Sequence, residues 1–109
     1  MDKEINGIVA LYREKLEGSG IKVKKIILFG SYAKGGVTEE SDIDLVVISD
    51  DFNKMDLWDR LCLLGRSRIG IKIPMEILGY TEEEYNKKEP GSFIYDEVKT
   101  IGKELELAQ

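Results

Sequence analysis

Residues 30–44 read GSYAKGGVTEESDID, and this stretch decides how the rest of the chain is interpreted. It opens with Gly30-Ser31 directly after the apolar run of residues 26–29, and it closes with Asp42 and Asp44 ahead of a second apolar run. Glycine lets a backbone approach a ligand closely, and a helix that starts just after it presents amide groups to an anion. The stretch therefore predicts a phosphate site at the junction of two strands.

The two aspartates stand at the start of a strand that we predict over residues 43–48. Side chains alternate between the faces of a strand, so Asp42 and Asp44 are expected on one face, roughly 6 to 7 Å apart. Two carboxylates this close are unfavourable unless a cation lies between them, and Mg²⁺ prefers oxygen ligands. Two Mg²⁺ ions about 3.5 to 4 Å apart support in-line displacement at phosphorus. The pair therefore favours phosphoryl or nucleotidyl transfer.

Three further residues are candidates for the same site. Ser31 offers a hydroxyl to a phosphate oxygen, and Lys34, one turn later, can reach a phosphate as a point charge. Glu76 is the only acid in the largely apolar run of residues 71–78, where a carboxylate is costly unless it is exposed or bound to a ligand. An exposed glutamate on an edge strand is the alternative interpretation of Glu76, and an ordinary surface lysine is that of Lys34.

Helices and strands alternate along the chain. Apolar residues at helical spacing predict a helix over residues 3–17 that ends at the glycines of residues 18–20. Strands are predicted over residues 23–29, 43–48 and 75–78, with Pro74 marking the start or an exposed edge of the third. A helix of about one turn should begin near Ser31, as its N-cap, and a polar connector should cover residues 37–41.

The second half of the chain is predicted to hold further helices. Asn53 should cap one from about residue 54 to residue 67, with Trp58 and its neighbouring leucines in the core. Thr81 and Glu84 have the spacing of a capping box, and Ser92 should cap a last helix with Phe93, Ile94, Val98 and Ile101 on its inner face. Residues 102–109 form a last strand or fray. The order predicts an α/β or α+β fold, with a small mixed sheet flanked by helices.

Composition limits the class of protein. The 109 residues suffice for one domain, over residues 1–109, with one hydrophobic core. A net charge of −5 has the wrong sign for direct binding to nucleic acid, and no apolar run approaches a membrane span. The chain lacks histidine and has one cysteine, Cys62, so a zinc cluster is not expected and Cys62 is interpreted as a core residue. Without a secretory signal, the protein is expected in the cytoplasm.

Gly30-Ser31, followed after residues 32–41 by Asp42-Ile43-Asp44, resembles the signature of the nucleotidyltransferase superfamily related to DNA polymerase beta. The short chain and the sequence Glu76-Ile77-Leu78-Gly79-Tyr80-Thr81 look like its minimal nucleotidyltransferase branch. The resemblance covers about residues 23–85. The sequence departs from the family where Glu76 stands in place of the usual aspartate and Lys34 in place of a common arginine.

The resemblance implies a nucleotidyltransferase fold, ATP or another nucleoside triphosphate bound with two Mg²⁺ ions, and transfer of a nucleoside monophosphate to a hydroxyl. Asp42, Asp44 and Glu76 would then bind the metal, and Gly30 and Ser31, with Lys34, the triphosphate. The branch includes antitoxins that adenylylate a tyrosine of a HEPN-domain toxin, so such a partner is expected, in a homo- or hetero-oligomer. The alternatives are an antitoxin that only binds nucleotide and masks its partner, or a nucleotidyltransferase for a small molecule.

Overall fold

The computed structural model describes residues 3–35, 37 and 42–105. Most of the predicted connector, including Ser41, and the last four residues of the chain lie outside the described residues. In chain order the elements are α1 (Lys3–Gly18), β1 (Lys25–Phe29), α2 (Ser31–Lys34), β2 (Ile43–Ile48), the 3-10 helix η1 (Asp50–Lys54), α3 (Leu57–Arg66), β3 (Met75–Tyr80), α4 (Glu82–Asn86), the π-helix η2 (Ile94–Lys99) and β4 (Lys103–Glu104).

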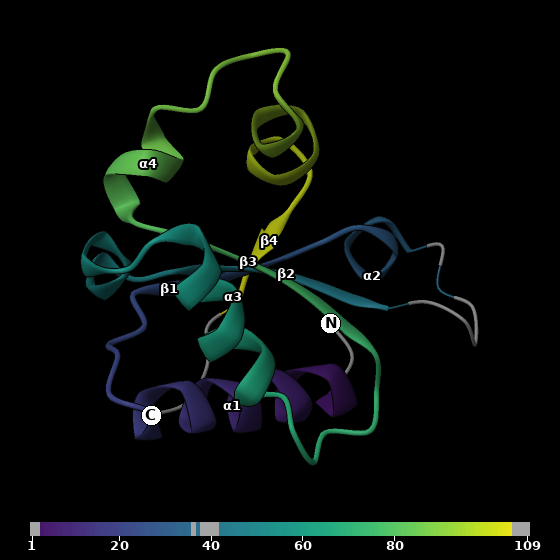
Figure 1. Ribbon diagram of the computed structural model, residues 1–109. Coiled ribbons are helices and arrows are strands. Elements are labelled where there is room, and N and C mark those ends of the chain that lie inside the picture. The colour runs from purple at the N-terminus through teal and green to yellow at the C-terminus, as the bar shows by residue number, and fades with distance from the viewer. Residues whose placement is uncertain (1–2, 36, 38–41, 106–109) are drawn as a thin grey trace.

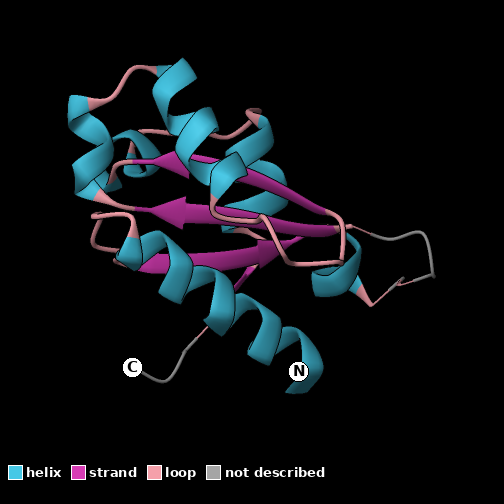
Figure 2. Ribbon diagram, turned by 60° about the horizontal axis from the view of Figure 1, so that its bottom comes forward, coloured by secondary structure: helices cyan, strands magenta, loops and turns pink. Residues whose placement is uncertain are grey.

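A mixed four-stranded sheet forms the centre of the structure, with strand order β3-β2-β1-β4. Strand β1 pairs antiparallel with β2 and β4, whereas β2 and β3 are parallel. Helix α1 covers one face of the sheet and α4 and η2 lie on the other (Figures 1 and 2). The predicted α+β fold with a small mixed sheet is confirmed.

Alternation along the strands divides the core into two apolar clusters. Odd-numbered residues of β2 and β3, such as Leu45 and Ile77, pack with α1 and α3. Even-numbered residues, such as Val46, pack with Ile94 and Val98 of η2. Asp44 and Glu76 are also even-numbered, so their side chains belong to the η2 face of the sheet.

Helix α3 begins later than predicted, and its buried face is different. Residues 50–54 form the 3-10 helix η1, and the side chain of Asp56, rather than Asn53, caps α3 by accepting from the Asp59 amide. Arg60, Leu63 and Leu64 are the buried residues of α3. The prediction that Trp58 and its neighbouring leucines are all core is therefore wrong, because the side chains of Leu57, Trp58 and Leu61 are 69%, 71% and 46% exposed.

Other local predictions have mixed outcomes. The capping box of Thr81 and Glu84 at the start of α4 is confirmed. Ser31 is not an N-cap, because Gly30 holds that position and no side chain caps α2. The Ser92 hydroxyl does accept from the Tyr95 amide at the start of the last helix.

Three side chains are more exposed than predicted. Ile94 and Val98 are buried as expected, but Phe93 and Ile101 are exposed. Cys62 is only partly buried.

Strand β3 forms one edge of the sheet, and two arginines reach across to it. Arg60 Nη1 donates to the Gly79 carbonyl at 3.4 Å, and Arg68 Nη1 donates to the Met75 carbonyl at 2.6 Å. The two carbonyls belong to odd-numbered residues of β3, whereas Glu76 is even-numbered and has its side chain on the η2 face of the sheet. Side-chain donors thus occupy part of the polar edge of β3.

Candidate active site

Asp44 and Glu76 lie side by side at one end of the sheet. Strands β2 and β3 are parallel, and their register pairs Asp44 directly with Glu76. Neighbouring strands are about 4.8 Å apart, so these two carboxylates share one small region of the η2 face. Asp42 precedes β2 by one residue and is exposed to solvent. The structure thus brings the three predicted carboxylates to one end of the sheet.

Gly30 makes room for the Asp44 carboxylate. The antiparallel register pairs Phe29, the last residue of β1, with Asp44, which places Gly30 just beyond it. Gly30 has φ 70° and ψ −150°, a conformation that favours glycine. A Cβ at Gly30 would overlap Asp44 Oδ2, so any side chain there would displace the carboxylate. The glycine of the Gly-Ser pair is therefore required by both its backbone conformation and the position of Asp44.

The charge balance of this cluster is unfavourable without a cation. Burial, then the neighbouring carboxylates of Glu76 and Asp42, raise the pKa of Asp44 to about 6. Among the described residues, no lysine or arginine forms a salt bridge with Asp42, Asp44 or Glu76. Crowded carboxylates that lack a cationic partner are the donor set that a hard divalent ion such as Mg²⁺ prefers.

The carboxylates do not form a closed metal cage. Within residues 3–35, 37 and 42–105, no three or more acidic, histidine or cysteine side chains are already arranged around a common metal position. Magnesium is commonly bound by one or two carboxylates, with water and substrate phosphate oxygens completing the coordination. The residues therefore fit an ion that is shared with a phosphate substrate.

Helix α2 (Ser31–Lys34) carries the remaining predicted residues and follows directly after Gly30. It begins at Ser31, which is partly exposed, and the residue after its end, Gly35, has a left-handed backbone and donates its amide to the Ser31 carbonyl. Lys34 lies on α2, where its Nζ is 2.7 Å from Glu97 Oε2 of η2. Lys34 is thus held by a carboxylate rather than left free for a phosphate.

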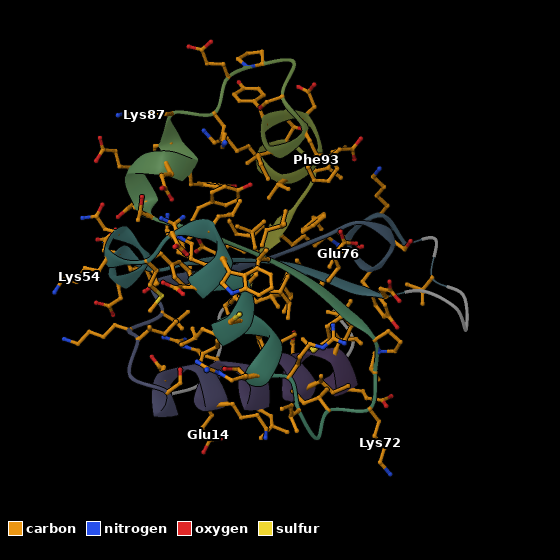
Figure 3. All side chains as sticks on the ribbon, viewed as in Figure 1. Glu14, Lys54, Lys72, Glu76, Lys87 and Phe93 are labelled. Atoms are coloured by element: carbon orange, nitrogen blue, oxygen red, sulfur yellow. The ribbon has the colours of Figure 1, made fainter. Side chains whose placement is uncertain are left out.

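Two contacts made by η2 and the residue before it were not predicted from the sequence. Glu97 pairs with Lys34, and Phe93 packs edge-on against Phe29 with ring centroids 5.8 Å apart. Glu76 and Phe93 both lie toward the η2 side of the molecule (Figure 3). No local pattern in the sequence links these residues to the Gly-Ser stretch, because the contacts depend on how η2 packs onto the sheet.

A hollow of about 410 Å³ lies beside the carboxylates at the β3 edge. Asp42 and Glu76 line it together with residues of α3 and β3, namely Leu61, Leu64, Gly65, Arg68, Met75 and Ile77. A larger hollow of about 710 Å³ is lined by Asp50, Glu82 and their neighbours, which follow the far ends of β2 and β3. The chemistry points to the smaller hollow, because the larger one contains none of the predicted site residues.

Known proteins of related sequence support the same interpretation. The family described as "Nucleotidyltransferase domain" matches residues 10–105. A protein of Methanocaldococcus jannaschii named "Putative protein adenylyltransferase MJ0604" is 42% identical over 94 residues, which cover 84% of this chain and 85% of that protein.

Two solved structures share the fold. One, a toxin-antitoxin complex with AMP-PNP, has a TM-score of 0.63 and 24% identity, and the match covers 95% of this chain and 74% of that chain. The other, a mutant of the toxin-antitoxin complex MntA-HpeT, has a TM-score of 0.58 and 26% identity, and the match covers 96% of this chain and 73% of that chain. In the described part of the chain, no helix has the length and apolar character needed to cross a membrane.

Proposed function

Since the chain belongs to the nucleotidyltransferase family, in its minimal nucleotidyltransferase branch, we propose that it transfers AMP from ATP to a hydroxyl of a partner protein. The acceptor in this proposal is a tyrosine of a HEPN-domain toxin, which the chain silences in the cytoplasm as its antitoxin. The name of the relative MJ0604 supports a protein as the acceptor, and the toxin-antitoxin structure MntA-HpeT supports a toxin as the partner. In this proposal residues 1–109 form a single nucleotidyltransferase domain.

The observation that carries the proposal is the pairing of Asp44 with Glu76 next to Gly30. The strand register places the two carboxylates side by side, and the missing side chain of Gly30 leaves space for Asp44 Oδ2. Burial and the acidic neighbours of Asp44 raise its pKa, which means that its charged form is unfavourable. A cation bound among these carboxylates would stabilise the charged form. This is the arrangement expected for residues that share a divalent ion with a triphosphate.

Each residue has a role in the proposed reaction. Asp42, Asp44 and Glu76 would hold two Mg²⁺ ions, and the chemistry that these ions would supply is neutralisation of charge on the triphosphate and on the leaving pyrophosphate. Gly30 and Ser31 bind phosphate oxygens through the backbone and the hydroxyl. The acceptor oxygen forms a bond to the α-phosphorus, the bond from that phosphorus to the bridging oxygen of pyrophosphate breaks, and the hydroxyl proton leaves to solvent.

Lys34 is proposed to exchange partners when ATP binds. Its present partner, Glu97, lies on η2, and the two side chains are 46% and 39% exposed. A salt bridge this exposed contributes little to stability, so a triphosphate can compete for the ammonium group. Lys34 would then add a positive charge to the phosphate site, although without the bidentate geometry that an arginine provides.

A transfer assay tests the proposal. The full chain is incubated with ATP labelled at the α-phosphate, Mg²⁺ and the candidate toxin encoded beside its gene. We expect label on the toxin, and loss of that label in the double variant Asp42→Asn, Asp44→Asn. Glu83→Gln is the matched control, because Glu83 is an exposed acid of α4 whose salt bridge is with Lys87, the residue directly after that helix.

Two outcomes would contradict the proposal. Neutralisation of the toxin that survives the double aspartate change would show that the chain acts by masking its partner. Label that appears on an added aminoglycoside but not on the toxin would instead assign a small-molecule acceptor. A labelled serine or threonine on the toxin would retain the reaction and replace only the acceptor residue.

A further inference from the structure

Helix α3 has apolar residues on the side that faces solvent as well as on the side that faces the core. Leu63 and Leu64 belong to the core. The opposite side carries no charge along its middle, where helical spacing aligns Trp58, Leu61, Cys62 and Gly65. Trp58 is 71% exposed, Leu61 is 46% exposed and Cys62 is partly buried. A surface helix normally has polar residues on this side, so these four residues, here called the α3 stripe, indicate a contact surface.

No described element of the chain covers the α3 stripe. Helix α3 faces the viewer in Figure 1, with no described helix or strand in front of it. At Gly65, nothing lies within 4 Å of the position that a Cβ would occupy, although glycine is a poor helix former. The stripe therefore has the bulky side chain of Trp58 at one end and an open position at the other.

Two residues of opposite charge border the α3 stripe. Asp59 follows Trp58 and Arg66 follows Gly65, and both are exposed. Two helical turns, about 10 Å, separate them, so they lie on the same side of the helix but too far apart to pair with each other. Among the described residues, neither forms a salt bridge. The stripe thus has an unpaired negative charge near its Trp58 end and an unpaired positive charge near its Gly65 end.

This arrangement is complementary to itself. When two copies of the chain bring their α3 stripes together antiparallel about a two-fold axis, the Trp58 end of one meets the Gly65 end of the other. Asp59 of each copy then lies within one helical turn of Arg66 of the other, on the same side of the interface. In a parallel arrangement each charge would face its own counterpart, which is unfavourable. The charges therefore favour a second copy of the chain, in the antiparallel orientation, as the occupant of the stripe.

We propose that the α3 stripe is the interface of a homodimer in which the two α3 helices pack antiparallel about a two-fold axis. Trp58 of each copy packs over Gly65 of the other, and Leu61 and Cys62 lie next to the axis. Asp59 and Arg66 form two salt bridges at the rim. Because a helix of 10 residues offers a small interface, we expect a dissociation constant on the order of 10 µM. The inference is independent of the reaction proposed above.

Sedimentation equilibrium of the full chain without any partner tests the dimer. The molecular mass should rise from that of a monomer to that of a dimer as the concentration passes the expected dissociation constant. Trp58 is the only tryptophan of the chain, so its fluorescence should shift to shorter wavelength over the same range as the indole leaves water. A chain that stays monomeric throughout would overturn the proposal, and α3 amide signals that shift only when the toxin is added would assign the stripe to the toxin instead.

A pair of matched substitutions tests where the interface lies. Leu61→Ser should raise the dissociation constant of the dimer by at least about tenfold, because it removes an apolar side chain next to the axis. Leu11→Ser is the control, since Leu11 also lies on a helix, α1, and its side chain is likewise 46% exposed. This control should leave the dissociation constant unchanged. Equal dissociation constants for the two variants would contradict an interface at α3.

An exchange of charges tests the antiparallel orientation. Asp59→Arg and Arg66→Asp should each weaken the dimer about tenfold, because each variant places like charges together at both ends of the interface. The double variant Asp59→Arg, Arg66→Asp should restore the parent dissociation constant. Since the two residues are too far apart to pair within one helix, such a restoration requires contact between copies. A double variant as weak as the single variants would overturn the proposed arrangement.

Discussion

The parallel strands β2 and β3 have carboxylates at both ends, but the negative charges are compensated in different ways. The near end is where the two strands begin, and the far end is where they finish. At the far end, Lys24 forms salt bridges with Asp50 at 2.6 Å and with Glu82 at 2.7 Å, and Arg60 holds Glu84 at 2.7 Å. At the near end, Asp44 has the carboxylates of Glu76 and Asp42 as neighbours. Acids that stabilise the fold have cationic partners, whereas the candidate catalytic acids are left for a cation from solution.

The pKa directions express the same difference. The hydrogen bond from Lys24 lowers the pKa of Asp50, and the hydrogen bond from Arg60 lowers that of Glu84. Burial and like charge raise the pKa of Asp44 to about 6. A carboxylate whose pKa is lowered on folding stabilises the fold when it is charged, and one whose pKa is raised destabilises it. The comparison therefore predicts different results for substitutions at the two ends.

The largest effect is expected on catalysis from a change at the near end. Glu76→Gln should lower the rate of AMP transfer about 1,000-fold, because it removes a charged metal ligand. Glu76→Asp should retain most of the activity, since aspartate is common at this position in the family that the sequence resembles. Glu82→Gln at the far end is the control and should change the rate less than about twofold. Similar losses in Glu76→Gln and Glu82→Gln would remove the distinction between the ends.

A large effect on stability is expected from Arg60→Met. The guanidinium donates to the carbonyls of Phe52 and Gly79 and pairs with both oxygens of Glu84. Its loss leaves buried acceptors without donors and should lower the free energy of unfolding by about 2 to 3 kcal/mol. Urea unfolding measures this change. Transfer activity per folded molecule should be retained, and a loss of activity in fully folded protein would contradict the separation of roles.

A smaller effect of opposite sign is expected from Asp44→Asn in metal-free protein. Removing the charge should raise the free energy of unfolding by about 1 kcal/mol at pH 8, a value reduced for the partial exposure of this carboxyl. Because the folded state raises the pKa of Asp44, its ionisation costs stability as the pH rises from about 4 through about 6. The increase in the free energy of unfolding caused by Asp44→Asn should therefore become smaller toward pH 4. Urea unfolding in EDTA at both pH values provides the measurement.

The smallest effect is expected from Lys24→Met. Lys24 is a surface residue, and salt bridges of this kind are screened by salt. The substitution should lower the unfolding midpoint slightly in dilute buffer and by less at high ionic strength. A loss that is independent of salt would show that Lys24 contributes through packing rather than through charge.

The sequence predicted the sheet better than it predicted the helices around it. The β-branched and apolar run of residues 43–48 and the acid in the middle of residues 71–78 are local signals, so β2 and the position of Glu76 could be inferred directly. The register that pairs Asp44 with Glu76 depends on strand packing and has no local signal. The predicted start of α3 is too early because Asn53 and Asp56 are both favourable N-cap residues. Asn53 lies inside the 3-10 helix of residues 50–54, so Asp56 caps α3.

Other parts of the site depend on tertiary contacts. The Gly-Ser pair indicated close backbone approach, but its use as space for the Asp44 carboxylate could be found only in three dimensions. The contact of Lys34 with Glu97 requires η2 to fold back over the sheet. The expectation that Trp58 is core failed because hydrophobicity alone does not show which side of a helix faces the sheet.

The two arginine contacts on β3 also affect how copies of the chain meet. An edge strand with free carbonyls is a template for pairing with a strand of another molecule. Arg60 and Arg68 donate to the carbonyls of Gly79 and Met75, so a foreign strand would have to replace charge-assisted hydrogen bonds. The edge beside the candidate active site is therefore protected against continuation of the sheet and against aggregation. A partner that approaches here meets the side chains of α3, which allow far more selectivity than a bare backbone.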